Sequence, residues 1–273
     1  MIETRKRVGE LLRVWRDARG LSQMALAHRA GISPRHMSFV ETGRSRPGRD
    51  VLLRLCDEMD VPFRERNRML EAAGYARMYR DSTLEDEAVE QVADVLRFIL
   101  RSHEPYSAVV VDSAWNVRMA NRPHEVLMER LLAHAPAEVR EEDNLLVQTF
   151  HPEGLRPAIR NFPEVADTLV SRLRRQAEEN PVREDYAELL DRLEDLGPVP
   201  EPPTRPRRGP LPILIPIELE VGGLLLRLFT TLTTLGTPQD ALLQELRVET
   251  FFPANEATEK ALRDLEPPSE AGS

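Results

Sequence analysis

The sequence predicts an α+β protein: an all-helical N-terminal domain of five helices, then a domain in which helices flank an antiparallel sheet. Three observations support this fold class. Over residues 3–75 apolar residues recur at helical spacing, interrupted by glycine and proline. Residues 213–221 alternate in polarity, Gly222-Gly223 can form a two-residue turn, and a second strand-like run begins at Leu224, as in a hairpin. Between the two regions, residues 145–196 carry mostly helical stripes.

The first region predicts five helices in succession. The first, over about residues 3–19, carries an apolar stripe made of Val8, Leu11, Leu12 and Trp15. Two short helices follow within Ser22–Gly43, and Gly31 ends the first of them because glycine readily adopts positive φ. Ser22 can cap the first of the two helices and Ser33 the second, each through its hydroxyl. Pro34 suits the first position of the second helix because no backbone donor is lost there. Two further helices are expected over about 49–59 and 63–73.

The second helix of the short pair leaves polar and aromatic side chains outside: Arg35, His36, Ser38, Phe39 and Thr42. Such a helix fits the major groove of DNA, where base edges offer donors and acceptors. The loop after it carries Arg44 and Arg46, which can approach a phosphate backbone. On these features alone, an ordinary helical hairpin with solvated arginines is the alternative.

Residues 3–75 resemble the XRE or Cro type of helix-turn-helix domain. The residues that carry the resemblance are Arg16, Gly20–Gln23, Leu26-Ala27, Gly31-Ile32, Glu41 and Gly43–Pro47. The resemblance implies a phosphate or base contact from Gln23, base readout by the second helix, and an internal ion pair between Arg16 and Glu41. Pro34 stands where some members have a polar residue. The residues expected to bind DNA are Gln23, Ser33, Pro34, Arg35, His36, Ser38, Phe39, Thr42, Arg44 and Arg46.

The charge distribution agrees with a DNA-binding N-terminal module. The chain has a net charge of −9, but residues 1–80 alone carry a net +7 and the remainder −16. Cys56, the single cysteine, lies on an apolar stripe, which favours a buried structural thiol in a reducing cytosol. The N-terminus has no apolar signal region, and no run of 18 apolar residues occurs. We therefore expect a cytoplasmic protein without a membrane-spanning segment.

The predicted domain layout has four parts. They are a helix-turn-helix domain at 1–75, a linker and connecting helix at 76–104, a ligand-binding domain at 105–265 and a disordered tail at 266–273. In the third part, short strands over 109–111 and 116–120 precede a helix over 122–134. A proline-rich stretch at 197–212 predicts an extended loop of open role.

The hairpin fixes its own register. A two-residue turn sets Leu219 opposite Leu226, Ile217 opposite Leu228, and Ile215 opposite Thr230, which makes one face aliphatic apart from the threonine. The other face then places Glu218 opposite Arg227, a favourable cross-strand pair. A third strand is expected over 245–252 and a short helix over 256–265.

After residue 80 the chain resembles the ligand-binding domain of MmyB-like regulators. The resemblance rests on the runs at 109–121, 144–162, 229–240 and 244–259. It implies a PAS-like sensor domain that follows a DNA-binding domain in the chain, and therefore a one-component transcription regulator. Some relatives hold a fatty-acid-like molecule in this domain, and an aliphatic sheet face suits such an apolar ligand.

The expected ligand-binding residues combine this sheet face with aromatic and apolar side chains from the helices, and with polar groups for a carboxylate head. They are Trp115, Arg118, Phe150, Arg160, Phe162, Leu169, Ile215, Ile217, Leu226, Leu228 and Thr230. Of these, Arg118, Arg160 and Thr230 are the candidates for the head group. An ordinary hydrophobic core requires the same aliphatic face, so both interpretations stay open.

We expect neither an enzyme nor a metal site or resident cofactor. The six histidines have no metal-ligand spacing with each other or with Cys56, and no GxSxG, P-loop or GxGxxG motif occurs. The expected partners are double-stranded DNA, a small apolar ligand and a second copy of the chain. A regulator whose C-terminal domain only dimerises or binds a protein partner is the alternative.

Overall fold

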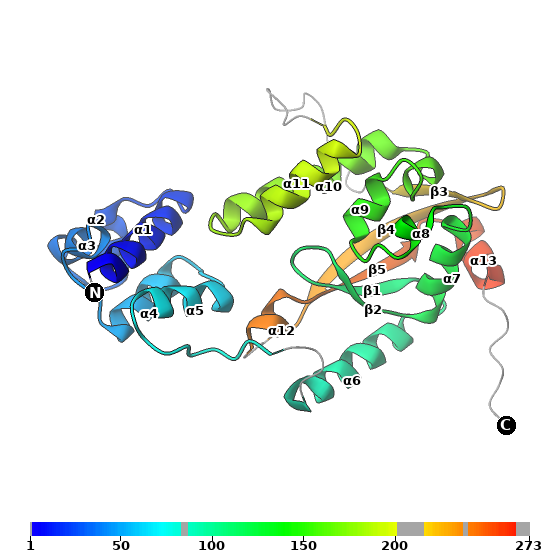
Figure 1. The fold of residues 1–273 in the computed structure, drawn as a ribbon. Helices are drawn as coiled ribbons and strands as arrows, with labels where there is room; N and C mark the ends of the chain where they lie inside the picture. The colour runs from blue at the N-terminus through cyan, green and yellow to red at the C-terminus, as the bar shows by residue number, and fades with distance from the viewer. Residues whose placement is uncertain (1, 83–86, 201–215, 237–239, 266–273) are drawn as a thin grey trace. The chain divides into compact units, whose positions relative to one another are not determined.

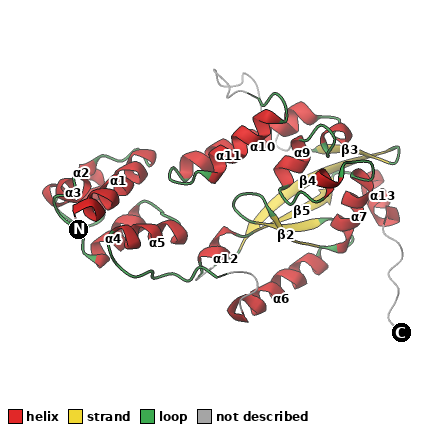
Figure 2. Ribbon diagram, in the orientation of Figure 1, coloured by secondary structure: helices red, strands yellow, loops and turns green. Residues whose placement is uncertain are grey.

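A computed structural model describes residues 2–82, 87–200, 216–236 and 240–265. The chain divides into two compact units. The first contains Met1–Thr83 together with Arg174–Ala187 and Gly236–Gln244, and the second contains Leu84–Leu173, Glu188–Leu235 and Glu245–Ser273. Figure 1 labels the elements along the chain, and Figure 2 shows that helices alone build residues 2–73, whereas strands and helices are mixed after residue 107.

The five helices predicted for the N-terminal region are present. They are α1 (Ile2–Ala18), α2 (Gln23–Arg29), α3 (Pro34–Glu41), α4 (Arg49–Glu58) and α5 (Phe63–Ala72). The hydroxyl of Ser22 accepts a hydrogen bond from the backbone N–H of Ala25, and that of Ser33 accepts one from His36, both at 3.1 Å. The two predicted serine caps are thus confirmed.

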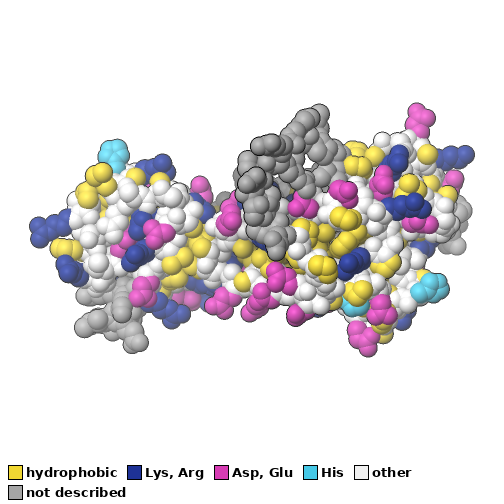
Figure 3. Space-filling model, turned by 90° about the horizontal axis from the view of Figure 1, so that it is seen from above, with side chains coloured by type: hydrophobic (Ala, Val, Ile, Leu, Met, Phe, Trp, Pro, Cys, Tyr) yellow, Lys and Arg dark blue, Asp and Glu magenta, His cyan; other side chains and the backbone are white. Residues whose placement is uncertain are grey.

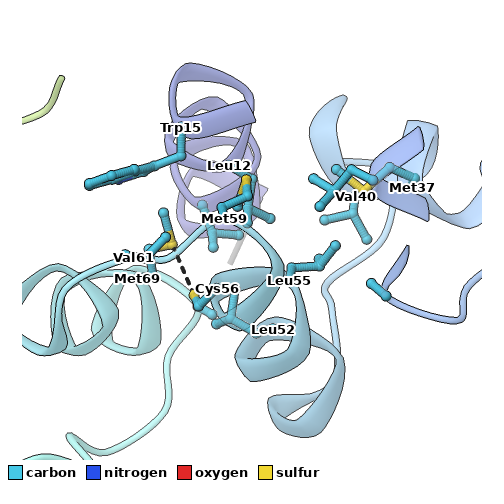
Figure 4. Close-up of a cluster of buried hydrophobic side chains, with 14 of the residues drawn as sticks. Leu12, Trp15, Met37, Val40, Leu52, Leu55, Cys56, Met59, Val61 and Met69 are labelled. Carbon is cyan, nitrogen blue, oxygen red and sulfur yellow. Dashed lines mark hydrogen bonds between the residues drawn. The ribbon is translucent and has the colours of Figure 1, made fainter. Parts of the chain in front are cut away.

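One hydrophobic core holds these helices together. Leu12 and Trp15 of α1, Met37 and Val40 of α3 and the apolar sides of α4 and α5 all belong to this core (Figure 4). Cys56 lies inside this core with its sulfur 3.5 Å from the Met69 sulfur, and burial raises the pKa of the thiol to about 12. The thiol therefore stays protonated and packs as a small apolar group, which is the predicted structural role.

The second unit is built on a five-stranded antiparallel sheet with the strand order β2-β1-β5-β4-β3. The strands are β1 (Ala108–Val111), β2 (Val117–Ala120), β3 (Ile217–Val221), β4 (Leu224–Thr234) and β5 (Arg247–Pro253). Its helices are α6 (Glu87–Ser102), α7 (Arg122–Leu131), α8 (Ala137–Arg140), α9 (Leu145–Phe150), α13 (Glu256–Leu265) and the first part of α10 (Phe162–Glu179). A short 3-10 helix, η1, spans Arg156–Ala158.

The predicted hairpin register is confirmed where the structure describes it. Leu219 pairs with Leu226 and Ile217 with Leu228, and Val221 and Leu224 close the turn. Gly222 and Gly223 have φ of 56° and 82°, the left-handed values that a tight two-residue turn requires. On the opposite face the Arg227 guanidinium donates to Glu218 at 3.0 Å. The expected partner of Thr230, Ile215, lies outside the described residues.

Two boundaries differ from the sequence-based expectation. The third strand begins at Arg247 rather than 245, because a short helix, α12 (Ala241–Glu245), precedes it. The Asp240 carboxylate accepts the backbone N–H of Leu242 at 2.8 Å and so favours a helix start. The helix expected over 122–134 ends at Leu131. Residues 201–212 of the predicted proline-rich loop lie outside the described residues, as does the predicted tail.

The long helices of the middle region are also present. They are α10 and α11 (Asp185–Asp195), and together with α9 they confirm that residues 145–196 are mostly helical. Among the described residues, the structure contains no helix both long and apolar enough to span a membrane.

Gly9 is the point of closest approach between α1 and α3. A Cβ atom placed there would lie 2.5 Å from the Val40 carbonyl oxygen and 2.6 Å from that of Glu41, and both are backbone atoms that cannot move aside alone. Alanine normally stabilises a helix relative to glycine by about 1 kcal/mol. We predict the opposite sign here: Gly9→Ala lowers the free energy of unfolding by about 1–3 kcal/mol.

Chemical denaturation of the full-length protein, monitored by far-UV circular dichroism, measures this effect. The matched control is Glu10→Ala, the next residue of α1, whose side chain is exposed. A Gly9→Ala variant as stable as the wild type would show that α1 and α3 are not in close contact.

Candidate DNA-binding surface and ligand cavity

Helix α3 presents the side chains expected to read DNA. Met37 and Val40 are fully buried, whereas Pro34 and Arg35 are exposed at the N-terminal end of the helix. Figure 3 shows Lys and Arg side chains spread over the surface of the helical N-terminal part. The exposed end of α3 therefore carries a cation in a position suited to a groove.

Phe39 lies between two arginines. The guanidinium carbon of Arg35 is 5.3 Å from the centre of the Phe39 ring, and that of Arg44 is 5.9 Å away. Both guanidinium groups thus lie within cation–π distance of the ring, which favours these positions of the two side chains. Arg46 instead lies 4.0 Å from the centre of the Tyr75 ring and donates to the Gly74 carbonyl at 3.0 Å, so part of its donor capacity is used within the domain.

Several of the predicted DNA contacts have a structural task as well. The Ser33 hydroxyl caps α3, and the Thr42 hydroxyl donates to the Ser38 carbonyl oxygen at 2.7 Å. The side chains of His36 and Ser38 are partly exposed on the same helix. Ser33 and Thr42 therefore stabilise the two ends of the helix, whereas Arg35, His36 and Ser38 leave side chains at least partly exposed between them.

The expected ion pair between Arg16 and Glu41 is present and buried. The Arg16 Nε donates to Glu41 Oε1 at 2.6 Å, and the Nη2 donates to Oε2 at 3.2 Å. This hydrogen bond raises the pKa of Arg16. Gln23 joins the pair, because its Nε2 donates to Glu41 Oε2 at 2.7 Å. One amide hydrogen of Gln23 is thus used within the domain, and the phosphate or base contact that the family resemblance implies for this residue stays a prediction.

The second unit contains a cavity of about 60 Å³ between one face of the sheet and the helices that cover it. Strands β3 and β5 form its sheet side, and α7, α9 and α10 supply most of the rest. Its lining residues are Ser107, Trp115, His124, Leu127, Met128, Leu131, Leu145, Leu146, Thr149, Leu155, Ile159, Val165, Leu169, Ile217, Leu219, Glu249 and Phe251. Most of this surface is apolar, as a hydrophobic ligand requires.

Three of the predicted ligand-binding residues line the cavity: Trp115, Leu169 and Ile217. Two others, Leu226 and Leu228, are buried in the apolar cluster of the same unit but are not among the lining residues. Phe150 and Phe162 pack edge-to-face on each other, with ring centres 5.3 Å apart, and are not among the lining residues either. Ile215 lies outside the described residues.

The arginines expected to hold a ligand head group lie elsewhere. Arg118 donates to Asp112 at 2.6 Å, and the nearest atoms of Arg160 and Glu220 are 2.9 Å apart. The side chains of the two arginines are 40% and 59% exposed. Successive side chains of a strand point to opposite faces of the sheet, so Glu220 points away from the face of the cavity-lining Leu219. Arg160 pairs with Glu220 and therefore lies on that other face. Sequence spacing could not reveal these acidic partners.

Trp115 lines the cavity, and its backbone has a strained conformation. Its φ of +69° is rare for a bulky residue, yet its side chain is only 1% exposed. The Asp112 carbonyl accepts the Trp115 N–H at 3.1 Å, and the Trp115 carbonyl accepts the N–H of Leu145 at 3.0 Å. These two bonds hold the turn that places the indole among the lining residues.

Sequence reasoning missed the polar groups of the cavity. His124 and Glu249 are almost fully buried, and burial lowers the pKa of His124 to about 4 and raises that of Glu249. Arg172 and a hydrogen bond from Thr230 act on the Glu249 pKa in the opposite direction. The sequence does contain a signal for Glu249. It lies two residues before the apolar Phe251 in a predicted strand, so the two side chains are expected on the same face of the sheet.

His124 forms a hydrogen-bonded pair with Ser107, with 2.8 Å between the imidazole Nδ1 and the hydroxyl oxygen. A serine–histidine pair suggests nucleophilic catalysis, but that mechanism needs a third group that orients the imidazole through its other nitrogen. Within the described ranges, no residue hydrogen-bonds to His124 Nε2. The same ranges contain no cluster of three metal-ligating side chains.

Comparisons with known proteins agree with the two-part organisation. Residues 7–69 match the model of a helix-turn-helix domain, and residues 92–265 match that of the MmyB-like transcription regulator ligand binding domain. The crystal structure of the clp gene regulator ClgR from Corynebacterium glutamicum matches with 22% identity over 37% of this chain and 95% of that one, at a TM-score of 0.23. The search of curated proteins gives no match.

A helix-turn-helix domain followed by a regulator-type ligand-binding domain defines a DNA-binding transcription regulator. Because the second match covers most of the chain, the protein belongs to the MmyB-like transcription regulators.

The buried His124 predicts an acid-sensitive contribution to stability. Its folded-state pKa of about 4 lies below the value of 6.5 for an unperturbed histidine, so below pH 6.5 the unfolded chain binds a proton that the folded protein does not. The contribution is fully present above pH 6.5 and is lost as the pH falls towards 4, by about 3 kcal/mol. We predict that His124→Gln abolishes this part of the pH dependence.

Denaturation at a series of pH values tests this prediction. The quantity compared at each pH is the difference in the free energy of unfolding between His124→Gln and the wild type. The comparison also removes the contribution of Glu249, whose raised pKa destabilises the folded state as the pH rises above the unfolded value of 4.5. The control is His134→Gln, which changes an exposed histidine. Parallel curves for the wild type and His124→Gln would contradict the prediction.

Proposed function

We propose that this regulator binds DNA sequence-specifically through α3 and senses a small apolar, fatty-acid-like ligand in a PAS-like C-terminal domain. The observation that supports the sensor role is the cavity, whose lining residues are apolar apart from four. The exposed Arg35 and the partly exposed His36 and Ser38 support base readout. DNA as a partner supports the expected cytoplasmic location.

In the proposed mechanism two copies of the chain act as a dimer. Each places its α3 in one of two successive major grooves, roughly 34 Å apart. The dimer has two relative arrangements of its DNA-binding domains. The ligand binds one of these arrangements more tightly and shifts the population towards it. Linkage requires that DNA in turn changes the affinity for the ligand.

The alternative is that the C-terminal domain only dimerises or binds a protein partner. The exposed face of α6 favours it, because Val95 and Phe98 are 51% and 66% exposed although both are apolar. A bound apolar molecule in the cavity separates the two proposals, because the alternative requires none.

We predict that Arg35→Ala weakens binding to the operator about 10- to 100-fold, the loss of about 1–3 kcal/mol expected when a base contact is removed. Binding to random DNA should change much less. Fluorescence anisotropy at one fixed salt concentration measures both affinities, because each phosphate contact makes binding salt-dependent. Arg13→Ala is the control, since Arg13 is exposed on α1 and pairs with Asp17 on the same helix.

An equal loss on operator and random DNA would show that Arg35 contacts only phosphate. An operator for the assay is obtained by selection from a random pool with the wild-type protein.

Native mass spectrometry of the purified full-length protein tests the sensor role. We predict a dimer that carries an adduct of a few hundred daltons on each subunit, released on denaturation. The variant Leu169→Trp places a larger side chain in the cavity wall and should remove the adduct. A wild-type protein without adduct that also fails to bind any added aliphatic amphiphile would favour the alternative.

A further inference from the structure

Helix α6 has apolar residues on two sides. Ala93, Leu96 and Leu100 are at most 5% exposed and form the buried side of the helix. On the outer side Val95 and Phe98 are 51% and 66% exposed. Polar residues normally occupy the solvent side of such a helix, so neighbouring exposed apolar side chains mark a surface that binds a partner.

The outer apolar side chains form a strip along the helix. Val92, Val95 and Ile99 follow each other at spacings of three and four residues, which place them on one side of a helix. Val92 and Ile99 are partly exposed, and Phe98 lies beside them. These four residues are called the α6 strip below. A strip with this spacing is typical of the seam between two packed helices.

A row of charged side chains borders the α6 strip on one side. Its members are Glu90, Asp94, Arg97 and Arg101, at spacings of four, three and four residues, and all four are exposed. The nearest atoms of Asp94 and Arg97 are 2.5 Å apart. The two acidic residues occupy the N-terminal half of the row and the two arginines the C-terminal half, so the row has a direction.

This direction selects the orientation of a second α6. When two copies of the helix pack antiparallel, their charged rows lie side by side and run in opposite directions. Glu90 then faces Arg101 of the second copy, and Asp94 faces Arg97. In a parallel pair each residue lies level with its own counterpart, so acidic residues would meet acidic residues and arginines would meet arginines. The charge order therefore favours the antiparallel pair.

The apolar residues fit the same register. With the charges paired in this way, Val92 of one copy lies opposite Ile99 of the other. The two-fold axis passes between residues 95 and 96, so the two copies of Val95 lie next to each other. One register thus joins opposite charges and covers the apolar strip, as a self-complementary two-fold interface requires.

We propose that α6 is a homodimer interface, in which the α6 helices of two copies pack antiparallel about a two-fold axis beside Val95. The α6 strip supplies the buried apolar area, and the charged rows set direction and register. This proposal rests on the dimer of the proposed function and assigns the residues that form it.

Cysteine cross-linking of the full-length protein tests the arrangement. The native Cys56 is fully buried with a pKa raised to about 12, so it does not compete with an introduced thiol. We predict that Val95→Cys, oxidised with diamide, forms a disulfide-linked dimer on a non-reducing gel. The matched control is Ser102→Cys on the same side of α6. Its two copies would lie roughly 20 Å apart along the helix axis and should not be linked.

Each outcome of the cross-linking is decisive. Linkage of Val95→Cys alone supports the antiparallel pair, whereas linkage of both variants would overturn it. Linkage of neither variant would show that another segment or another protein covers the α6 strip, and would overturn the interface.

Sedimentation velocity tests the charged rows through the dimer dissociation constant. Arg101→Glu places two acidic residues against each other at both ends of the helix pair and should weaken the dimer at least about tenfold. The further change Glu90→Arg in the same chain reverses both pairs and should restore the affinity to within about threefold. The control Arg175→Glu makes the same charge change at an exposed position of α10 and should have little effect.

The failure of this proposal is distinguishable from failure of the proposed function. A wild-type dimer that Arg101→Glu does not weaken, without a cross-link at residue 95, would keep the dimeric regulator and refute the α6 interface. A wild-type protein that stays monomeric in native mass spectrometry would refute both.

Discussion

The carboxylate of Glu41 lies buried where α1, α2 and α3 meet, and the position of α3, the proposed DNA-reading helix, depends on it. Arg16 donates twice to this carboxylate and Gln23 once. A buried pair of this kind contributes little net stability compared with apolar packing, but removal of one partner costs about 3–5 kcal/mol because a buried charge is left uncompensated. The network therefore acts as a constraint on position: α3 cannot rotate about its axis without breaking three charge-assisted hydrogen bonds.

Close packing adds a second constraint at the same place. Gly9 lets the backbones of α1 and α3 approach until no side-chain atom fits between them, and the approach occurs at the carbonyl groups of Val40 and Glu41. The ion pair and the glycine thus fix the same end of α3 by different physical means, one electrostatic and one steric. The opposite end is fixed by the Ser33 cap, so that the exposed face between them has a defined orientation.

The ease of prediction from sequence differed between the two units for a physical reason. The N-terminal helices follow local rules, namely caps at Ser22 and Ser33 and a glycine at the turn, and the sequence alone located them. The hairpin register also followed from local pattern, because its two faces differ in polarity and its turn has two residues. The cavity depends on contacts between distant segments. Whether Arg160 faces a ligand or Glu220 is decided by tertiary partners 60 residues apart, and periodicity contains no such information.

The same reasoning explains which cavity residues were missed. Hydrophobicity predicts Leu169 and Ile217 as lining residues, and both line the cavity. It equally predicts Leu226 and Leu228, which are not among the lining residues. His124 and Glu249 were passed over because ionisable residues are expected at the surface. Their burial costs free energy that a well-packed apolar pair would not, and natural cores accept such a cost mainly at functional sites. The buried His124 and Glu249 are therefore more informative about function than the apolar lining residues of the cavity.

The proposed ligand control of DNA binding sets a minimum size for the aliphatic part of the ligand. To move a two-state equilibrium from 1:99 to 99:1, a ligand must bind one state about 5.5 kcal/mol more tightly than the other. Each buried methylene contributes roughly 0.8 kcal/mol, so about seven methylenes must be buried in one state and exposed in the other. One hydrogen bond to His124 or Glu249 contributes only about 0.5–1.5 kcal/mol. In the proposed mechanism the aliphatic chain must therefore supply most of the switching free energy.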